Sequence, residues 1–462
     1  MNLATRILLV AISAGLGILV FHPVAWSGFA VLAWIPLIFA LGGAKPAHAL
    51  ILGLFHGTIF YGVTMSWLLD VFKDSRQTFI PLVLIMALFT AFFARGYAVA
   101  CRRHDRGWTT ALFAAVWWIA MEFYRAEIFY LKFPWMTPGV GLGPTWISPI
   151  LGVYGMGFLI ILGAALLCQK KKHRVIGAVL LGVMLASMWI QQNREVPQDT
   201  SVRIAAVQSE VADIDNYIKL TRAVTSKEDV DLILWPEYAI PSDVRRNKIQ
   251  WKQLIELSAE TRAVVVVGTQ TTRADKGWSN TALTLNQDGT LGEHYKNHTV
   301  HFFDDGVAGT EAKAVTTPQW KIGTPICFDN DYQDVVRRMV ADGAEFLTTP
   351  SMDAVHWGEK QHYQHAELFR HRAAENGRWI VVAATSGMTQ VIDPNGNRVK
   401  SLPIIEEGVL TAEIGKSSQQ TIYTRVGWLF PWVTMCVGGL WILWLFLVGI
   451  KEKRQSRDTR IA

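Results

Sequence analysis

Long apolar runs separated by short polar loops occupy the first part of the chain and recur near its C-terminal end. A membrane-spanning helix needs about 20 mostly apolar residues. The pattern predicts spans at residues 6–20, 29–43, 49–69, 79–94, 109–124, 147–168, 175–191 and 427–450. We therefore expect a polytopic α-helical membrane domain of seven spans over residues 1–191, and an eighth span with a basic tail over residues 427–462.

Residues 192–426 show a different pattern, in which short apolar runs rich in β-branched residues alternate with segments of helical periodicity. The apolar runs predict strands buried on both faces, at residues 202–208, 231–237, 264–270, 321–328, 345–351 and 380–385. Helices are predicted near residues 215–227, 248–262, 330–342 and 359–377. The turn signals Asp288-Gly289 and Asn395-Gly396 predict hairpins over residues 281–296 and 388–400. Together these elements indicate one α/β unit with a mixed sheet.

The charge is divided unevenly between these two parts. The whole chain carries a formal net charge of +6, but residues 192–426 hold 25 Lys and Arg against 31 Asp and Glu, a net of −6, and the rest of the chain holds +12. The basic residues therefore belong to the apolar part and form no basic folded surface for nucleic acid.

The basic residues also indicate an orientation. With the N-terminus inside, the inner loops and the tail hold fifteen Lys and Arg, Arg106 among them, and the outer short loops hold four. Lys and Arg in short loops are retained on the cytoplasmic side. We therefore expect both termini in the cytoplasm and residues 192–426 on the outer face of the membrane.

Cys327 is the only one of the four cysteines that lies within residues 192–426. An oxidising outer compartment favours disulfides, so a thiol without a partner in its own domain is either a buried small apolar residue or a reactive group. Cys327 ends an apolar run just before a predicted helix. At such a turn, helix N-terminal amides can stabilise a thiolate and a tetrahedral oxyanion.

Glu237 and Lys296 also lie at the ends of predicted strands. A carboxylate beside Trp235 and Pro236, in a partly apolar site, would have a raised pKa and could act as a general base. Lys296 could place an ammonium group near an oxyanion. The order Glu237, Lys296, Cys327, with spacings of 59 and 31 residues, resembles the nitrilase superfamily, whose triad of base, oxyanion-stabilising lysine and nucleophile these residues would form.

With eight spans added to such a domain, the chain resembles the apolipoprotein N-acyltransferase family of that superfamily. The motifs Phe133-Pro134-Trp135, Trp235-Pro236-Glu237 and Val391-Ile392-Asp393-Pro394 carry this resemblance. It implies a nitrilase-like αββα sandwich for residues 192–426, where the residue pattern alone indicates one sheet. It also implies substrate-binding or supporting roles for Trp135, Tyr217, Asp304, Phe328 and Asp329.

The reaction implied by the resemblance is an acyl transfer in the bacterial inner membrane. An acyl chain would pass from a membrane phospholipid to Cys327 as a thioester, and then to the N-terminal α-amine of a diacylglyceryl-cysteine apolipoprotein. We expect no cofactor, no nucleic-acid partner and a monomeric chain. His356, His362, His365 and His371 have no companion Cys or paired carboxylates in the sequence, so we predict no metal site.

Three alternatives stay open at this point. A membrane-anchored nitrilase-type amidase would keep the triad but use water to hydrolyse a soluble amide. A related acyltransferase would use a different amine acceptor, which the aspartates at 304 and 329 favour because the family has glutamates there. A catalytically inactive relative that serves as a binding or scaffold protein is disfavoured, because all three triad residue types are present.

Overall fold

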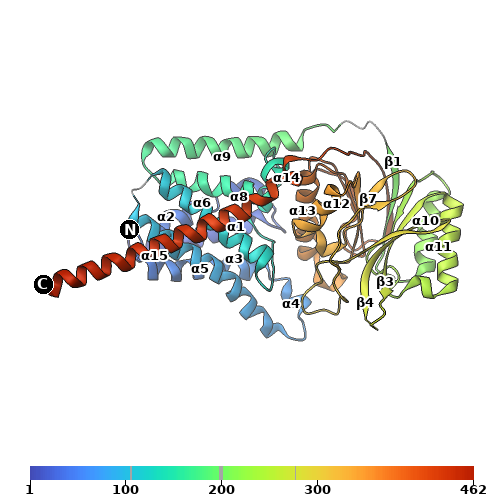
Figure 1. The fold of residues 1–462 in the computed structure, drawn as a ribbon, viewed down its shortest axis with the longest axis horizontal. Coiled ribbons are helices and arrows are strands. Elements are labelled where there is room, and N and C mark those ends of the chain that lie inside the picture. The colour runs from blue at the N-terminus through green and yellow to red at the C-terminus, as the bar shows by residue number, and fades with distance from the viewer. Residues whose placement is uncertain (105–106, 197–200, 276, 462) are drawn as a thin grey trace. The chain divides into compact units, whose positions relative to one another are not determined.

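The computed structural model describes residues 1–104, 107–196, 201–275 and 277–461, so Arg106 lies outside the described residues. The chain divides into two compact units. The first comprises Met1–Gly143, Val153–Trp189 and Trp428–Ala462, and the second comprises Pro144–Gly152 and Ile190–Gly427. Helices build the first unit, whereas strands and helices build the second (Figure 1).

Six helices in the described part of the chain are long and apolar enough to cross a membrane. They are α1 (Leu3–Val20), α3 (Pro46–Thr64), α5 (Phe79–Arg103), α8 (Ser148–Leu167), α9 (Lys171–Gln192) and α15 (Phe430–Ile461). The other two expected spans are shorter or broken. Residues 29–43 divide into a 3₁₀ turn, Ser27–Val31, and α2 (Ile35–Leu41). α6 (Trp108–Phe123) has 16 residues and continues into a π-helical turn, Tyr124–Ile128. Two short helices, α4 (Leu68–Val71) and α7 (Pro138–Leu142), lie in connections.

α3 and α5 pack closely because of two glycines one helical turn apart. A Cβ atom at Gly53 would lie 2.6 Å from the carbonyl oxygen of Thr90, and a Cβ atom at Gly57 would lie 2.6 Å from the Cα of Ala87. Small residues spaced four apart let membrane helices approach at backbone distance. A larger side chain at either glycine would therefore separate α3 from α5.

The second unit contains the strands that the β-branched runs predict. The strands are β1 (Val202–Gln208), β2 (Leu232–Leu234), β3 (Val264–Thr272), β4 (Trp278–Asn286), β5 (Gly289–Tyr295), β6 (Val315–Thr316), β7 (Lys321–Gly323), β8 (Phe346–Ser351), β9 (Ile380–Ala384), β10 (Gln390–Ile392), β11 (Arg398–Ser401) and β12 (Gly408–Ile414). The helices are α10 (Ile214–Thr225), α11 (Lys248–Thr261), α12 (Asp334–Ala341), α13 (Glu359–Asn376) and the short α14 (Ile422–Arg425).

These strands form two six-stranded sheets, in the orders β12-β1-β2-β3-β4-β5 and β11-β10-β9-β8-β7-β6. The central strands β1-β2-β3 and β7-β8-β9 are parallel, and antiparallel strands flank them. Val266 of the first sheet and Val381 of the second belong to one core between the sheets. α10 and α11 pack on the outer face of the first sheet, and α12 and α13 on that of the second (Figure 1). The αββα sandwich implied by the resemblance is confirmed.

The single mixed sheet indicated by the residue pattern is therefore wrong. Strands buried on both faces have near-continuous apolar runs, whichever sheet they join. Hydrogen-bond pairing between strands from distant parts of the chain places β1 to β3 in one sheet and β7 to β9 in the other. The apolar pattern within each run carries no information about which strands will pair.

Two strands are also shorter than predicted. Residues 231–237 give only Leu232–Leu234, and residues 321–328 give only Lys321–Gly323. Proline lacks the N–H group that a ladder hydrogen bond needs, and Pro236 and Pro325 follow the ends of these strands. Glu237 and Cys327 therefore lie in the segments just beyond their strands.

Candidate active site

Glu237 lies in the segment after β2, held against the neighbouring strand β3. Trp235 N–H donates to the carbonyl of Val266 at 2.9 Å, and Ile240 N–H donates to the carbonyl of Gly268 at 3.1 Å. A Cβ atom at Gly268 would lie 2.2 Å from the Pro236 carbonyl oxygen, so only glycine permits this approach. The side chain of Glu237 is 2% exposed and therefore almost fully desolvated.

Lys296 follows β5 and faces two carboxylates. Its backbone N–H donates to the carbonyl of Asn280 on β4 at 2.9 Å. Its Nζ lies 2.8 Å from Oε1 of Glu237 and 2.8 Å from Oδ2 of Asp305. The side chain of Lys296 is 2% exposed. One cation is thus shared between two buried anions, and this arrangement couples their titration.

Cys327 begins a 3₁₀ turn, Cys327–Asn330, after β7. Its φ of 44° lies in the left-handed region, which is uncommon for a non-glycine residue and recurs at functional sites. The Sγ donates to the carbonyl oxygen of Met352 at 3.6 Å, and the residue is 4% exposed. The expected helix does not begin directly after the thiol, because α12 starts only at Asp334. The turn itself orients the thiol.

The three groups affect one another's protonation. Burial, reinforced by the charge of Glu237, raises the pKa of the Cys327 thiol well above its usual range, while Lys296 opposes the shift. Burial and the charge of Asp305 raise the pKa of Glu237. Burial alone would lower the pKa of Lys296, but Glu237 and Asp305 raise it well above its usual range. Cys327 therefore rests as a thiol, and Glu237 is a carboxylate with increased basicity.

Asp329 fixes the backbone on both sides of this cluster. Its Oδ1 accepts from the N–H groups of Asn297 and His298 at 2.9 Å each, directly after Lys296. Its Oδ2 accepts from the N–H of Ile326 at 3.1 Å and lies 2.9 Å from Nε2 of His294. The side chain is fully buried. Asp329 thus connects the lysine segment to the cysteine segment.

Besides Glu237, the carboxylate that pairs with Lys296 is that of Asp305 and not that of Asp304. Asp304 is exposed and only receives a backbone N–H from Gly306 at 3.4 Å. Asp305 pairs with Lys296 and also accepts from Asn280 Nδ2 at 2.8 Å and from the Tyr238 hydroxyl at 2.5 Å. The expectation for Asp304 fails by one residue, since spacing along a loop does not determine which of two adjacent side chains points inward.

Sequence reasoning missed Asn280 and Tyr238 altogether. Asn280 Nδ2 also donates to Oε1 of Glu237 at 2.6 Å and lies 2.8 Å from the Tyr238 hydroxyl oxygen. Asn280 lies at a buried position near the start of β4, and no sequence pattern marked it, although a buried amide needs polar partners.

Tyr217 lies in a hydrophobic core and is 1% exposed. It lies on α10, stacks on Trp235 with ring centroids 5.2 Å apart, and donates its hydroxyl to the carbonyl of Ser209 at 2.7 Å. Both rings belong to the core between α10, α11 and the first sheet. The loose sequence match at this position placed a buried packing residue in the site.

Phe328 and Trp135 are found in two different units. Phe328 is half-buried beside Cys327 and packs edge-on against Tyr332, with ring centroids 5.5 Å apart. Trp135 lies in the first unit, is 3% exposed and contacts the rings of Trp67 and Phe133. Phe328 is thus adjacent to Cys327, whereas Trp135 packs among aromatic residues of the membrane unit.

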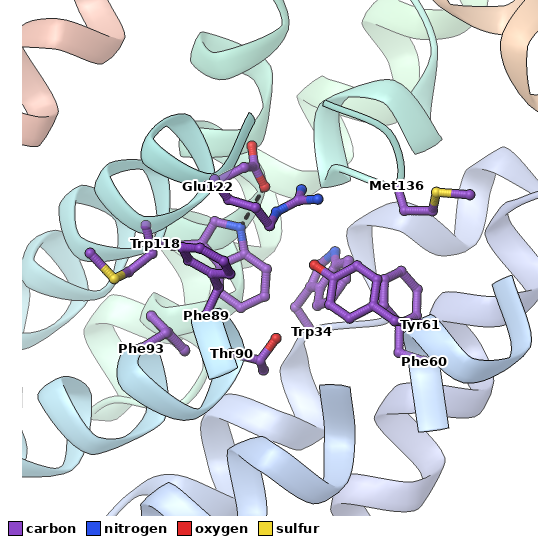
Figure 2. A pocket seen from close by; sticks show the side chains of 11 residues that line it. Trp34, Phe60, Tyr61, Phe89, Thr90, Phe93, Trp118, Glu122 and Met136 are labelled. Carbon is purple, nitrogen blue, oxygen red and sulfur yellow. Dashed lines mark hydrogen bonds between the residues drawn. The ribbon is translucent and has the colours of Figure 1, made fainter. Parts of the chain in front are cut away.

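The first unit also holds a small pocket of about 20 Å³, room for about one water molecule, lined mostly by aromatic side chains together with a few polar ones (Figure 2). Trp118 Nε1 donates to Glu122 at 2.9 Å, and Thr90, Tyr61 and Arg125 also line the pocket. Glu122 lies inside an apolar run, so the sequence pattern gave it no role. Buried ionisable groups in membrane helices are costly and are often functional.

Among the residues that the structure describes, no three His, Cys, Asp or Glu side chains are grouped to hold a metal ion. Two carboxylates nevertheless flank one of the histidines on α13. His365 lies between Asp331 and Asp353, and Asp353 Oδ1 is 2.8 Å from its Nδ1.

The comparisons with known proteins agree with this architecture. The sequence model of the carbon-nitrogen hydrolase family matches residues 185–423, more than half of the chain. The chain belongs to the carbon-nitrogen hydrolase family. Its apolar part matches the apolipoprotein N-acyltransferase N-terminal domain over residues 13–166.

Relatives with both parts share almost the whole length of the chain. The apolipoprotein N-acyltransferase of Pseudomonas paraeruginosa is 27% identical, over 97% of this chain and 97% of its own. That of Geobacter metallireducens is 26% identical, over 90% of this chain and 89% of its own. A solved carbon-nitrogen hydrolase from Helicobacter pylori is 19% identical, covers 50% of this chain and 94% of its own, and superposes with a TM-score of 0.43.

Proposed function

We propose that this protein is an apolipoprotein N-acyltransferase. It would move an acyl chain from a membrane phospholipid, through a thioester on Cys327, to the N-terminal α-amine of a diacylglyceryl-cysteine apolipoprotein. The observation that carries the proposal is the ion pair of Glu237 and Lys296 beside the Cys327 thiol, in a chain that also has membrane-spanning helices. Relatives that are similar along the whole chain carry that enzyme's name.

In the first half-reaction Glu237 accepts the proton of the Cys327 thiol, and the sulfur bonds to the ester carbonyl carbon of the phospholipid. The charge develops on the carbonyl oxygen, where the Lys296 ammonium stabilises it. The bond to the glycerol oxygen then breaks, and Glu237 returns its proton to that oxygen. A lysophospholipid leaves, and the acyl chain remains as a thioester.

In the second half-reaction the α-amine of the acceptor bonds to the thioester carbonyl carbon. Glu237 accepts a proton from the attacking nitrogen. When the carbon–sulfur bond breaks, that proton returns to the Cys327 sulfur. The products are the N-acylated lipoprotein and the free enzyme.

Both substrates are lipids, so the membrane unit has a physical purpose in this scheme. Anchoring the active site at the surface where donor and acceptor reside raises their effective concentration. The distribution of Lys and Arg supports an inner-membrane protein with cytoplasmic termini and the catalytic unit on the outer face. Asp329 is fully buried and accepts from backbone N–H groups of both the lysine and the cysteine segments, so in this scheme it holds Lys296 and Cys327 in position.

A transfer assay tests the proposal. The purified full chain is incubated with phospholipid labelled in one acyl chain and with a diacylglyceryl-cysteine peptide. The proposal predicts labelled N-acyl peptide and lysophospholipid in equal amounts with the wild type, and neither product with Cys327→Ala. Release of labelled free fatty acid at the same rate with or without the peptide would instead indicate a hydrolase.

A further inference from the structure

His365 of α13 is a buried histidine between two buried carboxylates. Its Nδ1 lies 2.8 Å from Oδ1 of Asp353, and its Nε2 lies 3.3 Å from Oδ1 of Asp331. The exposed fraction of the histidine side chain is 2%. The ring of Phe369, on the same helix, lies 4.9 Å from the imidazole. The imidazole is therefore surrounded by opposite charge and apolar atoms.

The two carboxylates belong to the two segments that hold the Cys327 thiol. Asp331 directly follows the Cys327–Asn330 turn, and its N–H donates to the carbonyl of Phe328 at 3.2 Å. Asp353 follows Met352, whose carbonyl oxygen accepts from the Cys327 Sγ at 3.6 Å. His365 thus contacts the residue after the nucleophile turn on one side and the residue after the thiol's acceptor on the other.

Asp353 is held from further directions, so its place beside the thiol is fixed. Gln361 Nε2 donates to Oδ1 of Asp353 at 2.7 Å. The backbone N–H of Asp353 donates to the Thr385 hydroxyl at 3.2 Å, and the Ser386 hydroxyl donates to the backbone carbonyl of Asp353. His362, one turn before His365 on α13, also helps to lower the pKa of Asp353.

The charge of the histidine follows from these neighbours. Burial alone would lower the pKa of His365, but the carboxylates of Asp353 and Asp331 raise it to about 10. The imidazole is therefore a cation at neutral pH. The negative charge of Asp353 is one of the causes that raise the pKa of the Cys327 thiol, and the imidazolium offsets that charge.

We propose that His365 is a cationic positioning residue, which ties the Cys327 turn to the segment after β8 and offsets the negative charge of Asp353 beside the thiol. The proposal rests on the proposed role of Cys327 as nucleophile. Without the imidazolium, the negative charge of Asp353 would no longer be offset, and thiolate formation nearby would become less favourable.

The test is the pH dependence of Cys327 alkylation by iodoacetamide in the full chain, resolved by peptide mass spectrometry because three other cysteines are present. In His365→Gln, we expect the curve of Cys327 alkylation rate against pH to move to higher pH. If the pKa of the Cys327 thiol rises by about one unit, the alkylation rate at pH 8 should be about tenfold lower than in the wild type. His365→Lys keeps the charge and should restore much of the rate.

His371→Gln is the matched control, since His371 is also buried on α13. Its profile should equal that of the wild type. An unchanged profile in His365→Gln, or an equal shift in His371→Gln, would overturn the proposal.

A second variant covers the case in which His365→Gln does not fold. Asp353→Asn removes the carboxylate whose charge opposes the thiolate, so its profile should move to lower pH. No movement, or movement to higher pH, would contradict the proposal. Alkylation requires no acyl transfer, so these outcomes are independent of whether the protein transfers acyl chains to apolipoproteins.

Discussion

The ammonium nitrogen of Lys296 lies 2.8 Å from a carboxylate oxygen of Asp305, a second acid besides Glu237. Because Asp305 contributes to the raised pKa of Glu237, Asp305→Asn should leave Lys296 paired with Glu237 alone and make Glu237 a weaker base. We expect slower formation of the acyl-enzyme and an acid limb of its pH profile that moves to lower pH.

Asp304→Asn is the matched control for this prediction. Asp304 is adjacent in sequence, exposed, and does not pair with Lys296. Single-turnover rates of the two variants across pH provide the measurement. If Asp304→Asn were the slower enzyme, the assignment of Asp305 as the supporting acid would be wrong.

Removing the base should slow the chemistry without displacing the side chain. Glu237→Gln can keep a hydrogen bond from Lys296 Nζ, which lies 2.8 Å from the carboxylate oxygen in the wild type. It cannot accept the thiol proton, so acylation of Cys327 should fall by about 10²- to 10⁴-fold. The rate is measured by quenched-flow mass spectrometry. A loss of less than about tenfold would show that another group accepts the proton.

Acyl-enzyme formation should also depend on pH in a defined direction. Burial and Asp305 raise the pKa of Glu237 above 4.5, and only the ionised carboxylate accepts a proton. As pH is lowered, the rate should therefore fall, and the midpoint of this fall should lie at a higher pH than for a glutamate with an ordinary pKa. A rate that stays constant down to pH 4.5 would contradict the raised pKa.

The charge on His365 predicts a pH-dependent contribution to stability. The pKa of this histidine is about 10 in the folded protein, against 6.5 for a histidine in the unfolded chain. A raised pKa stabilises the fold fully below pH 6.5, and the contribution is lost as pH rises to about 10. The Tm difference between wild type and His365→Gln, measured in detergent, should therefore shrink between pH 6.5 and 10. A constant or growing difference would show that the imidazolium contributes no such stability.

Tyr217→Phe should affect stability and not activity. The change removes the hydrogen bond to the Ser209 carbonyl, which is 2.7 Å long, at a cost of about 1 kcal/mol. The phenyl ring can still stack on Trp235. Thermal unfolding and the transfer assay are measured on the same preparation. A loss of transfer at unchanged Tm would restore a substrate role for Tyr217.

Local sequence patterns predict the elements of the second unit well, because each depends on neighbouring residues. β1 matches its predicted range, residues 202–208, and both predicted hairpins form; the first turns at Gln287-Asp288, so that Gly289 begins β5, and the second turns around Gly396. β2 and β7 end early because Pro236 and Pro325 interrupt the ladder, although the apolar runs continue past them.

Properties that depend on distant segments could not be predicted this way. Whether Asp304 or Asp305 faces Lys296 depends on how one loop folds against β4 and β5. The carboxylates beside His365 come from two segments outside its helix, so the histidine has no visible partners in the sequence. The division into two sheets and the core position of Tyr217 likewise arise from packing between elements far apart in the chain.

The most direct test of the proposed mechanism is the intact mass of the folded full chain after incubation with phospholipid and no acceptor. The mechanism predicts a mass increase of one acyl chain, on Cys327 by peptide mapping, which disappears when a diacylglyceryl-cysteine peptide is added. Cys436→Ala, which changes an exposed cysteine, should still form the adduct, and Cys327→Ala should not. Folded wild type without an adduct, or an adduct that persists in Cys327→Ala, would contradict the mechanism.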